Sequence, residues 1–147
     1  MSLYQTNSGW AKVIFKPMPN AYLLDANVFI WIISDPTRIS SSAAAVASDK
    51  SNRLLLSLST VWEIQIKAQL GKLTFPAPLG DILDKQMEIN QIELIALRLD
   101  YILKLGELPN HHRDPFDRLL IAQALVEDLT IISSDPMFRQ YNVSVLW

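Results

Sequence analysis

The chain has 147 residues, half of them hydrophobic, a composition that fits one compact domain with a large core. Its 13 basic and 15 acidic residues give a net charge of −2, which gives no support to broad electrostatic capture of duplex DNA. Cysteine is absent, which excludes disulfides, thiolate metal ligands and a cysteine nucleophile. No apolar run approaches the ~20 residues that span a bilayer, and the first residues do not read as a signal peptide. We therefore expect a cytoplasmic protein with no membrane partner.

Short apolar runs alternate with longer helical segments along most of the chain. Residues 1–20 are polar and proline-containing, and we interpret them as an N-terminal extension before a domain at residues 21–147. In that domain, the predicted strands are residues 21–24, 54–56, 92–94, 130–132 and 143–146. The predicted helices are residues 28–34, 40–51, 59–70, 78–90 and 98–105, a further helix that begins at Pro115 and includes the apolar stretch 119–126, and one more helical turn after Pro136. This alternation predicts an α/β fold of three α/β/α layers, with a central, mainly parallel sheet covered on both faces.

Acidic residues follow the predicted strands or begin the helices after them. Asp25 comes directly after the first strand, and Asp135 follows the strand at 130–132. Glu63 lies about one turn into the helix after the second strand, and Asp117 begins the apolar helix that leads to the 130–132 strand. Ligands of parallel α/β sheets bind outside the carboxyl ends of the strands. These four acids are therefore candidate functional residues.

The acids at the start of the helix that begins at Pro115 also have structural interpretations. Asp114 precedes Pro115, which suits the first helical position, so Asp114 is a good N-cap. Asp117 could simply gain ~0.3–1 kcal/mol from the helix dipole. Asp25 is the hardest to explain in this way, because the end of a buried strand gains nothing obvious from a charge.

The other acids have structural alternatives as well. Asp135 precedes a proline and could cap the next helical turn. Glu63 could form a helix-surface pair with Lys67, four residues later, which contributes ~0.2–0.5 kcal/mol. Asp35 shares the Asp-Pro pattern but follows a helix, so we expect only a cap or turn there.

Grouped carboxylates require a counter-charge. Two carboxylates ~4 Å apart repel by roughly 4 kcal/mol at an effective dielectric constant of 20. No Lys or Arg adjoins Asp25 in sequence. Hard oxygen ligands, with no thiolate and no well-placed imidazole, favour Mg²⁺ or Mn²⁺. Because Mg²⁺ held by acids accepts phosphate oxygens, this pattern favours phosphodiester hydrolysis, in which the metal activates water and stabilises the leaving oxygen.

Four segments resemble a known family in their order and spacing: YLLDANVFIW, STVWEIQIKAQLGKL, HHRDPFDRLLIAQA and IISSDPMFRQY. Together they resemble the PIN domain, and more narrowly the VapC toxins of bacterial VapBC toxin–antitoxin pairs. The resemblance covers Tyr22 to Trp147 and implies a PIN-like (Rossmannoid) fold and an endoribonuclease that uses Mg²⁺ or Mn²⁺ held by acids. The residues before Tyr22 depart from the usual family pattern.

Matched position by position, the resemblance implies roles for seven polar residues. The metal-binding and catalytic acids would be Asp25, Glu63, Asp117 and Asp135. Asp114 is an additional candidate ligand, while Asn27 and Ser133 would support the first and last acids.

The resemblance also implies partners. VapC-like proteins are homodimers silenced by a VapB-like antitoxin that lies in a groove beside the active site, and their substrates are structured RNAs cut at single-stranded loops. Residues 28–33 and Trp62 could line such a groove, although ordinary core packing explains each of them equally well. Basic side chains near the acids could hold phosphates or be surface charges: Lys67, Arg113, Arg118 and Arg139. His111 and His112 could bind substrate, but we interpret them as loop residues without a catalytic role.

Two alternatives to a toxin ribonuclease remain open. One is a phosphatase with Asp25 as nucleophile, although the haloacid-dehalogenase pattern needs an aspartate where this chain has Asn27. The other is a catalytically silent PIN-like module that binds RNA or a protein partner. This second alternative does not explain why the four acids would lie together.

Overall fold

The computed structural model describes residues 20–147, so the predicted extension lies outside the described residues apart from Asn20. Five strands form one sheet in the order β3-β2-β1-β4-β5, and every neighbouring pair is parallel. The strands are β1 (Ala21–Leu24), β2 (Arg53–Ser57), β3 (Glu93–Ile95), β4 (Thr130–Ile132) and β5 (Val145–Leu146).

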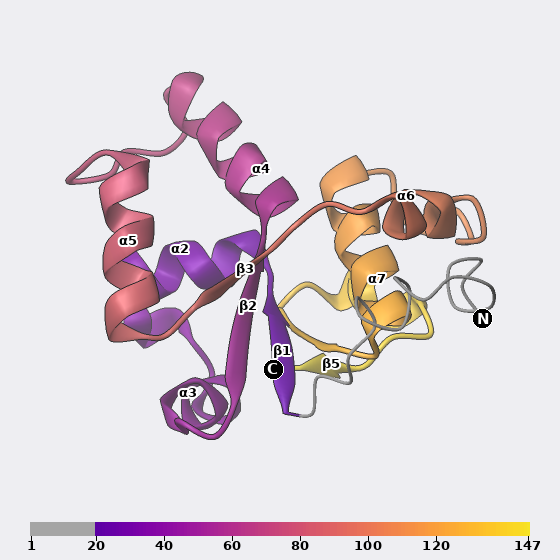
Figure 1. Ribbon diagram of the computed structural model, residues 1–147, viewed down its shortest axis with the longest axis horizontal. Helices are drawn as coiled ribbons and strands as arrows, with labels where there is room; N and C mark the ends of the chain where they lie inside the picture. Colours follow the sequence, from indigo (N-terminus) through magenta and orange to yellow (C-terminus); the bar gives the residue numbers. More distant parts are fainter. Residues whose placement is uncertain (1–19) are drawn as a thin grey trace, which may run out of the picture.

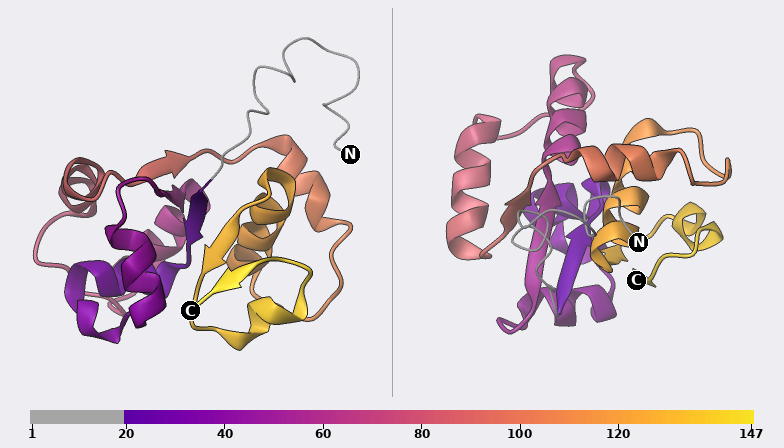
Figure 2. Two further views of the ribbon diagram at one scale, coloured as in Figure 1. Left: turned by 90° about the horizontal axis from the view of Figure 1, so that it is seen from below. Right: turned by 45° about the vertical axis from the view of Figure 1, so that its right-hand side comes forward.

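Helices cover both faces of this sheet (Figure 1). They are α2 (Ala26–Ser34), α3 (Ser41–Ser48), α4 (Leu58–Gln69), α5 (Leu79–Ile89), α6 (Leu99–Leu105) and α7 (Pro115–Glu127), with 3-10 turns η1 (Pro36–Arg38) and η2 (Pro136–Gln140). Helix α6 lies against α7 in every view (Figure 2). The predicted three-layer α/β/α class is therefore confirmed, and the sheet is wholly parallel.

Side-chain alternation along the central strands creates two cores. Leu23 of β1 pairs in register with Leu55 and Ile131, and all three point into one core together with residues of α7. The next residues along the strands, such as Leu24 and Ile132, belong to the opposite core, with residues of α2, α3 and α4. Because successive residues of a strand face opposite sides, strands with both faces covered are almost continuously apolar.

The order of the strands creates a switch point between β1 and β4. From β1 the chain first builds outward through β2 and β3, and it later returns to the other side of β1 with β4 and β5. At the carboxyl ends of β1 and β4, the loops leave the sheet in opposite directions. Open α/β sheets bind their ligands in the crevice that forms at such a point. The residues that directly follow β1 and β4 are therefore the first to consider for function.

Most differences from the predicted elements are shifts of one or two residues. Strand β3 begins at Glu93 because Ile92 donates its backbone N–H to Gln86 O at the end of α5 (3.4 Å), with Gln91 in a left-handed conformation (φ 54°). Helix α2 begins at Ala26, directly after Asp25. In the described part of the chain, no helix is both long enough and apolar enough to cross a membrane.

Candidate active site

Asp25 occupies the N-cap position of α2, but its side chain does not cap the helix. Instead, its Oδ2 accepts a hydrogen bond of 2.7 Å from the Ser133 hydroxyl, which follows β4. The side chain is buried, with Asp25 only 6% exposed. A carboxylate at the end of a central strand is thus available for a role other than helix capping.

Ser133 links the residues that follow β1 to those that follow β4. While its hydroxyl donates to Asp25, its oxygen accepts the backbone N–H of Asp135 at 3.0 Å. Asp135 in turn caps η2, with Oδ1 accepting from the Met137 N–H at 2.9 Å. The predicted cap is therefore confirmed, and the same contacts hold Asp135 beside Asp25.

Replacing Ser133 by alanine should lower the free energy of unfolding by about 1–3 kcal/mol, because it leaves a buried acceptor and a backbone donor without their partner. Urea denaturation measures this difference. The matched control is Ser134→Ala, since Ser134 is exposed, and it should change stability by less than ~0.5 kcal/mol. Equal stability of the two variants would contradict the bridging role.

Glu63 is buried on α4, with 7% of its surface exposed. Its Oε2 forms an ion pair with Lys67 Nζ at 3.0 Å, as the i, i+4 spacing predicts. The expectation of an ordinary surface pair is nevertheless wrong, because Glu63 points inward and its Oε1 has no hydrogen-bond partner among residues 20–147. A buried carboxylate oxygen without a donor is costly, so this atom is suited to contact a bound group.

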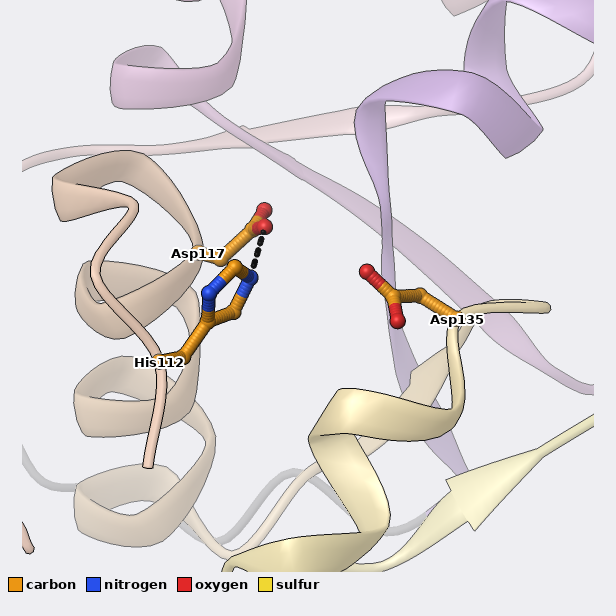
Figure 3. Close-up of side chains that lie close together, drawn as sticks. All are labelled: His112, Asp117 and Asp135. Carbon is orange, nitrogen blue, oxygen red and sulfur yellow. Dashed lines mark hydrogen bonds and ion pairs between the residues drawn. The ribbon is translucent and has the colours of Figure 1, made fainter. Parts of the chain in front are cut away.

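The two acids at the start of α7 have separate roles. Asp114 Oδ1 accepts the backbone N–H groups of Phe116 (2.8 Å) and Asp117 (3.2 Å), so the predicted N-cap is confirmed. Asp117 does not cap the helix. Its Oδ2 lies 2.7 Å from Nε2 of His112 (Figure 3).

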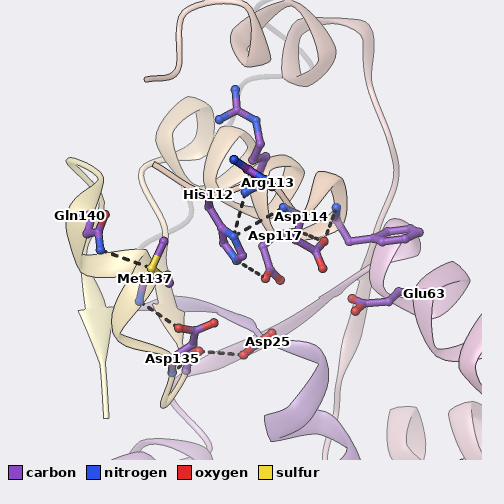
Figure 4. A network of polar contacts seen from close by, with 12 residues as sticks. Asp25, Glu63, His112, Arg113, Asp114, Asp117, Asp135, Met137 and Gln140 are labelled. Atoms are coloured by element: carbon purple, nitrogen blue, oxygen red, sulfur yellow. Dashed lines mark hydrogen bonds and ion pairs between the residues drawn. The ribbon is translucent and has the colours of Figure 1, made fainter. Parts of the chain in front are cut away.

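These side chains meet at the carboxyl edge of the sheet. Figure 4 shows the carboxylates of Asp25, Glu63, Asp117 and Asp135 grouped there, although they come from four different parts of the chain. Ligand atoms of His112, Asp117 and Asp135 all lie within 4.8 Å of one another. The structure therefore places the four acids at one edge of the sheet, with ligand atoms of Asp117 and Asp135 within 4.8 Å of each other.

Burial and mutual repulsion raise the pKa of two of these acids. For Asp25, desolvation by burial raises the pKa; the Ser133 hydrogen bond lowers it, and the charges of Glu63 and Asp135 raise it further. For Asp117, desolvation and the neighbouring charges of Asp25 and Asp114 raise the pKa to about 7, despite the hydrogen bond from His112. Within the described residues, Lys67 is the only Lys or Arg in an ion pair with these acids, so the cluster carries excess negative charge.

A hard divalent cation fits this cluster. The available donors are carboxylate oxygens, which suit Mg²⁺ and Mn²⁺. The free Oε1 of Glu63 is a buried acceptor without a protein donor. A cation would satisfy that atom and relieve the repulsion that raises the pKa of Asp25 and Asp117.

One expectation about an individual side chain needs correction, and the supporting role of Asn27 stays a prediction. The sequence offered no well-placed imidazole, yet His112 contacts Asp117. Only the fold of the loop before α7 reveals this contact. In the sequence, the one weak signal for it was that His112 lies close to the Asp-Pro cap of that helix. Asn27, predicted to support Asp25, is exposed, and among residues 20–147 it makes no hydrogen bond to that carboxylate.

Comparison with known proteins identifies the family. The family model of the PIN domain matches residues 22–143. The chain belongs to the PIN domain family. A comparison with curated protein sequences gives no match. The predicted family is thus confirmed over nearly the whole of the described PIN domain.

Solved structures with the same fold include VapBC and FitAB structures. The structure of VapBC2 from Rickettsia felis, bound to a DNA fragment from their promoter, matches with a TM-score of 0.66 and 18% identity, covering 86% of this chain and 97% of that one. The structure of VapBC-1 from nontypeable Haemophilus influenzae matches with a TM-score of 0.65 and 18% identity, covering 86% of this chain and 96% of that one. FitAcB from Neisseria gonorrhoeae gives 0.59 and 20% identity, again with 86% and 96% coverage. At these identities the likeness concerns the fold of the PIN domain.

Proposed function

We propose that this PIN domain is a divalent-cation-dependent endoribonuclease and the toxin of a toxin–antitoxin pair. One observation carries the proposal: Asp25, Asp117 and Asp135 meet at the switch point of the sheet with no Lys or Arg paired to them in residues 20–147. The electrostatic repulsion among these carboxylates is smallest when a cation is bound between them. Membership in the PIN family and the likeness to VapBC structures support the toxin assignment.

In this proposal, Asp25, Asp117 and Asp135 hold Mg²⁺ or Mn²⁺, and Glu63 contributes the free Oε1. When bound, a cation of this class activates water and offsets the charge of the phosphodiester. Ser133 holds Asp25 in place through its hydroxyl. Hydrolysis forms one bond from water oxygen to phosphorus and breaks one bond from phosphorus to the leaving sugar oxygen. A proton leaves the water for a carboxylate or the solvent, and the leaving oxygen takes one up.

Incubating the purified protein with total RNA, with Mg²⁺, with Mn²⁺ and with EDTA, tests this function. We expect discrete cuts in unpaired loops, where bases are accessible, and no cuts in EDTA. Mapping the new ends identifies the substrate. Tight RNA binding without cuts under either cation would instead indicate a silent PIN-like module.

An exposed apolar row on α4 supports an antitoxin partner. Leu58, Trp62 and Leu70 are exposed, Trp62 by 61% of its surface, and its ring packs edge-on against Phe116 at 5.2 Å. Each of these two aromatic residues directly precedes an acid of the cluster, so a peptide covering them would lie beside the cluster. In the α2 run, Val28 and Phe29 are buried in the core, and Ile30, Ile32 and Ile33 pack against it half-buried. Co-expression with the product of a neighbouring gene should abolish toxicity and RNA cleavage together.

The proposal includes a homodimer. Helix α6 exposes Leu99, Ile102 and Leu103, and exposed apolar residues in a cluster are typical of interaction surfaces. Sedimentation equilibrium at micromolar concentration should give twice the mass of one chain.

A further inference from the structure

The loop before α7 holds His112 in a defined position. Its backbone N–H donates to the hydroxyl oxygen of Tyr141 at 2.8 Å. Arg118 Nη1 donates to the same oxygen at 3.2 Å and to Pro109 O at 2.9 Å. Tyr141 itself is buried in the core. The position of His112 is thus built into the fold, although sequence analysis treated the residue as part of a plain loop.

Backbone donors determine which ring nitrogen of His112 carries hydrogen. The N–H of Arg113 donates to Nδ1 at 3.0 Å, and the N–H of Asp114 faces the same atom at 3.5 Å. An imidazole nitrogen that accepts a hydrogen bond carries a lone pair, so the hydrogen of the neutral ring is on Nε2. Nε2 lies 2.7 Å from Oδ2 of Asp117. His112 is therefore the donor in this contact and Asp117 the acceptor (Figures 3 and 4).

The same contacts argue against the ring as a metal ligand. Nε2 lies within 4.8 Å of the nearest ligand atoms of Asp117 and Asp135, but to bind a cation it must expose a lone pair. The hydrogen would then have to move to Nδ1, where the N–H groups of Arg113 and Asp114 point. Donating to Asp117 needs no such rearrangement.

Asp117 needs a donor because its surroundings are otherwise repulsive. The carboxylates of Asp25, Asp114 and Glu63 surround it (Figure 4). Without a donor, the Asp117 carboxylate would reduce its electrostatic repulsion by turning away from the other acids. It would then lose its alignment. A hydrogen bond to a ligand carboxylate fixes its orientation and tunes its affinity, and removal of such an outer partner typically weakens metal binding 10–100-fold.

We propose that His112 is a positioning residue, which holds Oδ2 of Asp117 through Nε2–H and leaves Oδ1 for the cation. This inference rests on the proposed use of Asp117 as a metal ligand. It assigns His112 no contact with the cation or with the reacting atoms.

The test measures cation binding without RNA, by calorimetric titration of Mg²⁺, Mn²⁺ and Co²⁺ into four purified variants. His112→Ala removes the donor and should raise the dissociation constants of all three cations by about 10–100-fold. His112→Gln places an amide N–H at the position of Nε2 and should restore most of the affinity. His112→Asn keeps an acceptor at the position of Nδ1 but does not reach Asp117, so it should behave like the alanine variant. His111→Phe is the matched control, because it removes the adjacent, exposed imidazole but keeps an aromatic ring against Tyr141, and it should bind like the wild type.

The remaining outcomes overturn the inference in distinguishable ways. A loss confined to Mn²⁺ and Co²⁺, with Mg²⁺ binding intact, would make His112 a nitrogen ligand instead. Unchanged binding by His112→Ala, or failure of His112→Gln to recover affinity while its thermal midpoint stays that of the wild type, would remove the positioning role but leave the proposed nuclease untouched. Absence of cation binding by the wild type would overturn the proposed function as well.

Discussion

Asp25→Asn and Asp117→Asn should each reduce RNA cleavage by at least ~10³-fold, which corresponds to about 4 kcal/mol of lost transition-state stabilisation. Asparagine keeps the shape of each side chain and can still accept the bonds from Ser133 and His112. It removes the negative charge that the proposed cation requires. Initial rates of cleavage of a mapped RNA, at saturating Mg²⁺, measure the loss.

The matched control is Asp35→Asn. Asp35 flanks α2 as Asp25 does, but it lies exposed at the other end of that helix, away from the carboxyl edge of the sheet, and its variant should cleave like the wild type. Thermal unfolding without cation should place both site variants at or above the wild-type midpoint, because each removes a repelling charge. Mg²⁺-dependent cleavage retained by both folded site variants would contradict the proposed function.

Without cation, the stability of the protein should fall as the pH rises from about 4 to about 8. The pKa of Asp117 is raised to about 7 in the folded state, and the pKa of Asp25 is raised as well. A carboxyl whose folded pKa exceeds its unfolded pKa binds more protons in the folded state between those two values. Its contribution to stability is therefore complete below the unfolded pKa, and it is lost as the pH rises through the folded pKa.

Mg²⁺ should reverse this loss, because a cation binds the ionised carboxylates. At pH 8 and a Mg²⁺ concentration of ~100 times the dissociation constant, linkage adds about 2.7 kcal/mol. For a domain of this size, that raises the unfolding midpoint by roughly 5–10 °C. At pH 5 the increase should be much smaller. Calorimetry in EDTA and in Mg²⁺, at matched ionic strength, measures both effects.

Asp117→Asn is the control for the pH effect, since other groups also titrate in this range. The variant should show a flatter pH dependence in EDTA and a smaller Mg²⁺ shift than the wild type. A wild-type midpoint in EDTA that rises between pH 5 and pH 8 relative to this variant would contradict the raised pKa of Asp117.

Local patterns were sufficient to predict the elements and the acids. Continuous apolar runs such as residues 21–24 indicated strands buried on both faces, because period and composition act over a few residues. The Asp-Pro sequence at Asp114 predicted its cap, since a cap depends on the next three residues only. The same locality predicted Asp25 at the end of a strand.

Contacts between distant parts of the chain were decided by tertiary structure alone. Ser133 binds Asp25 across 108 positions of sequence, and this contact exists only because β4 pairs with β1, a strand far from it in the chain. Burial of Glu63 likewise depends on how α4 lies over the sheet, which its spacing from Lys67 does not encode. Periodicity and capping residues predict whether a segment forms a helix or a strand. The order of the strands in the sheet and the paths of the loops depend on how the whole chain packs. Residue types and local order therefore identified the acids, and only the packed sheet placed His112 and Ser133 against them.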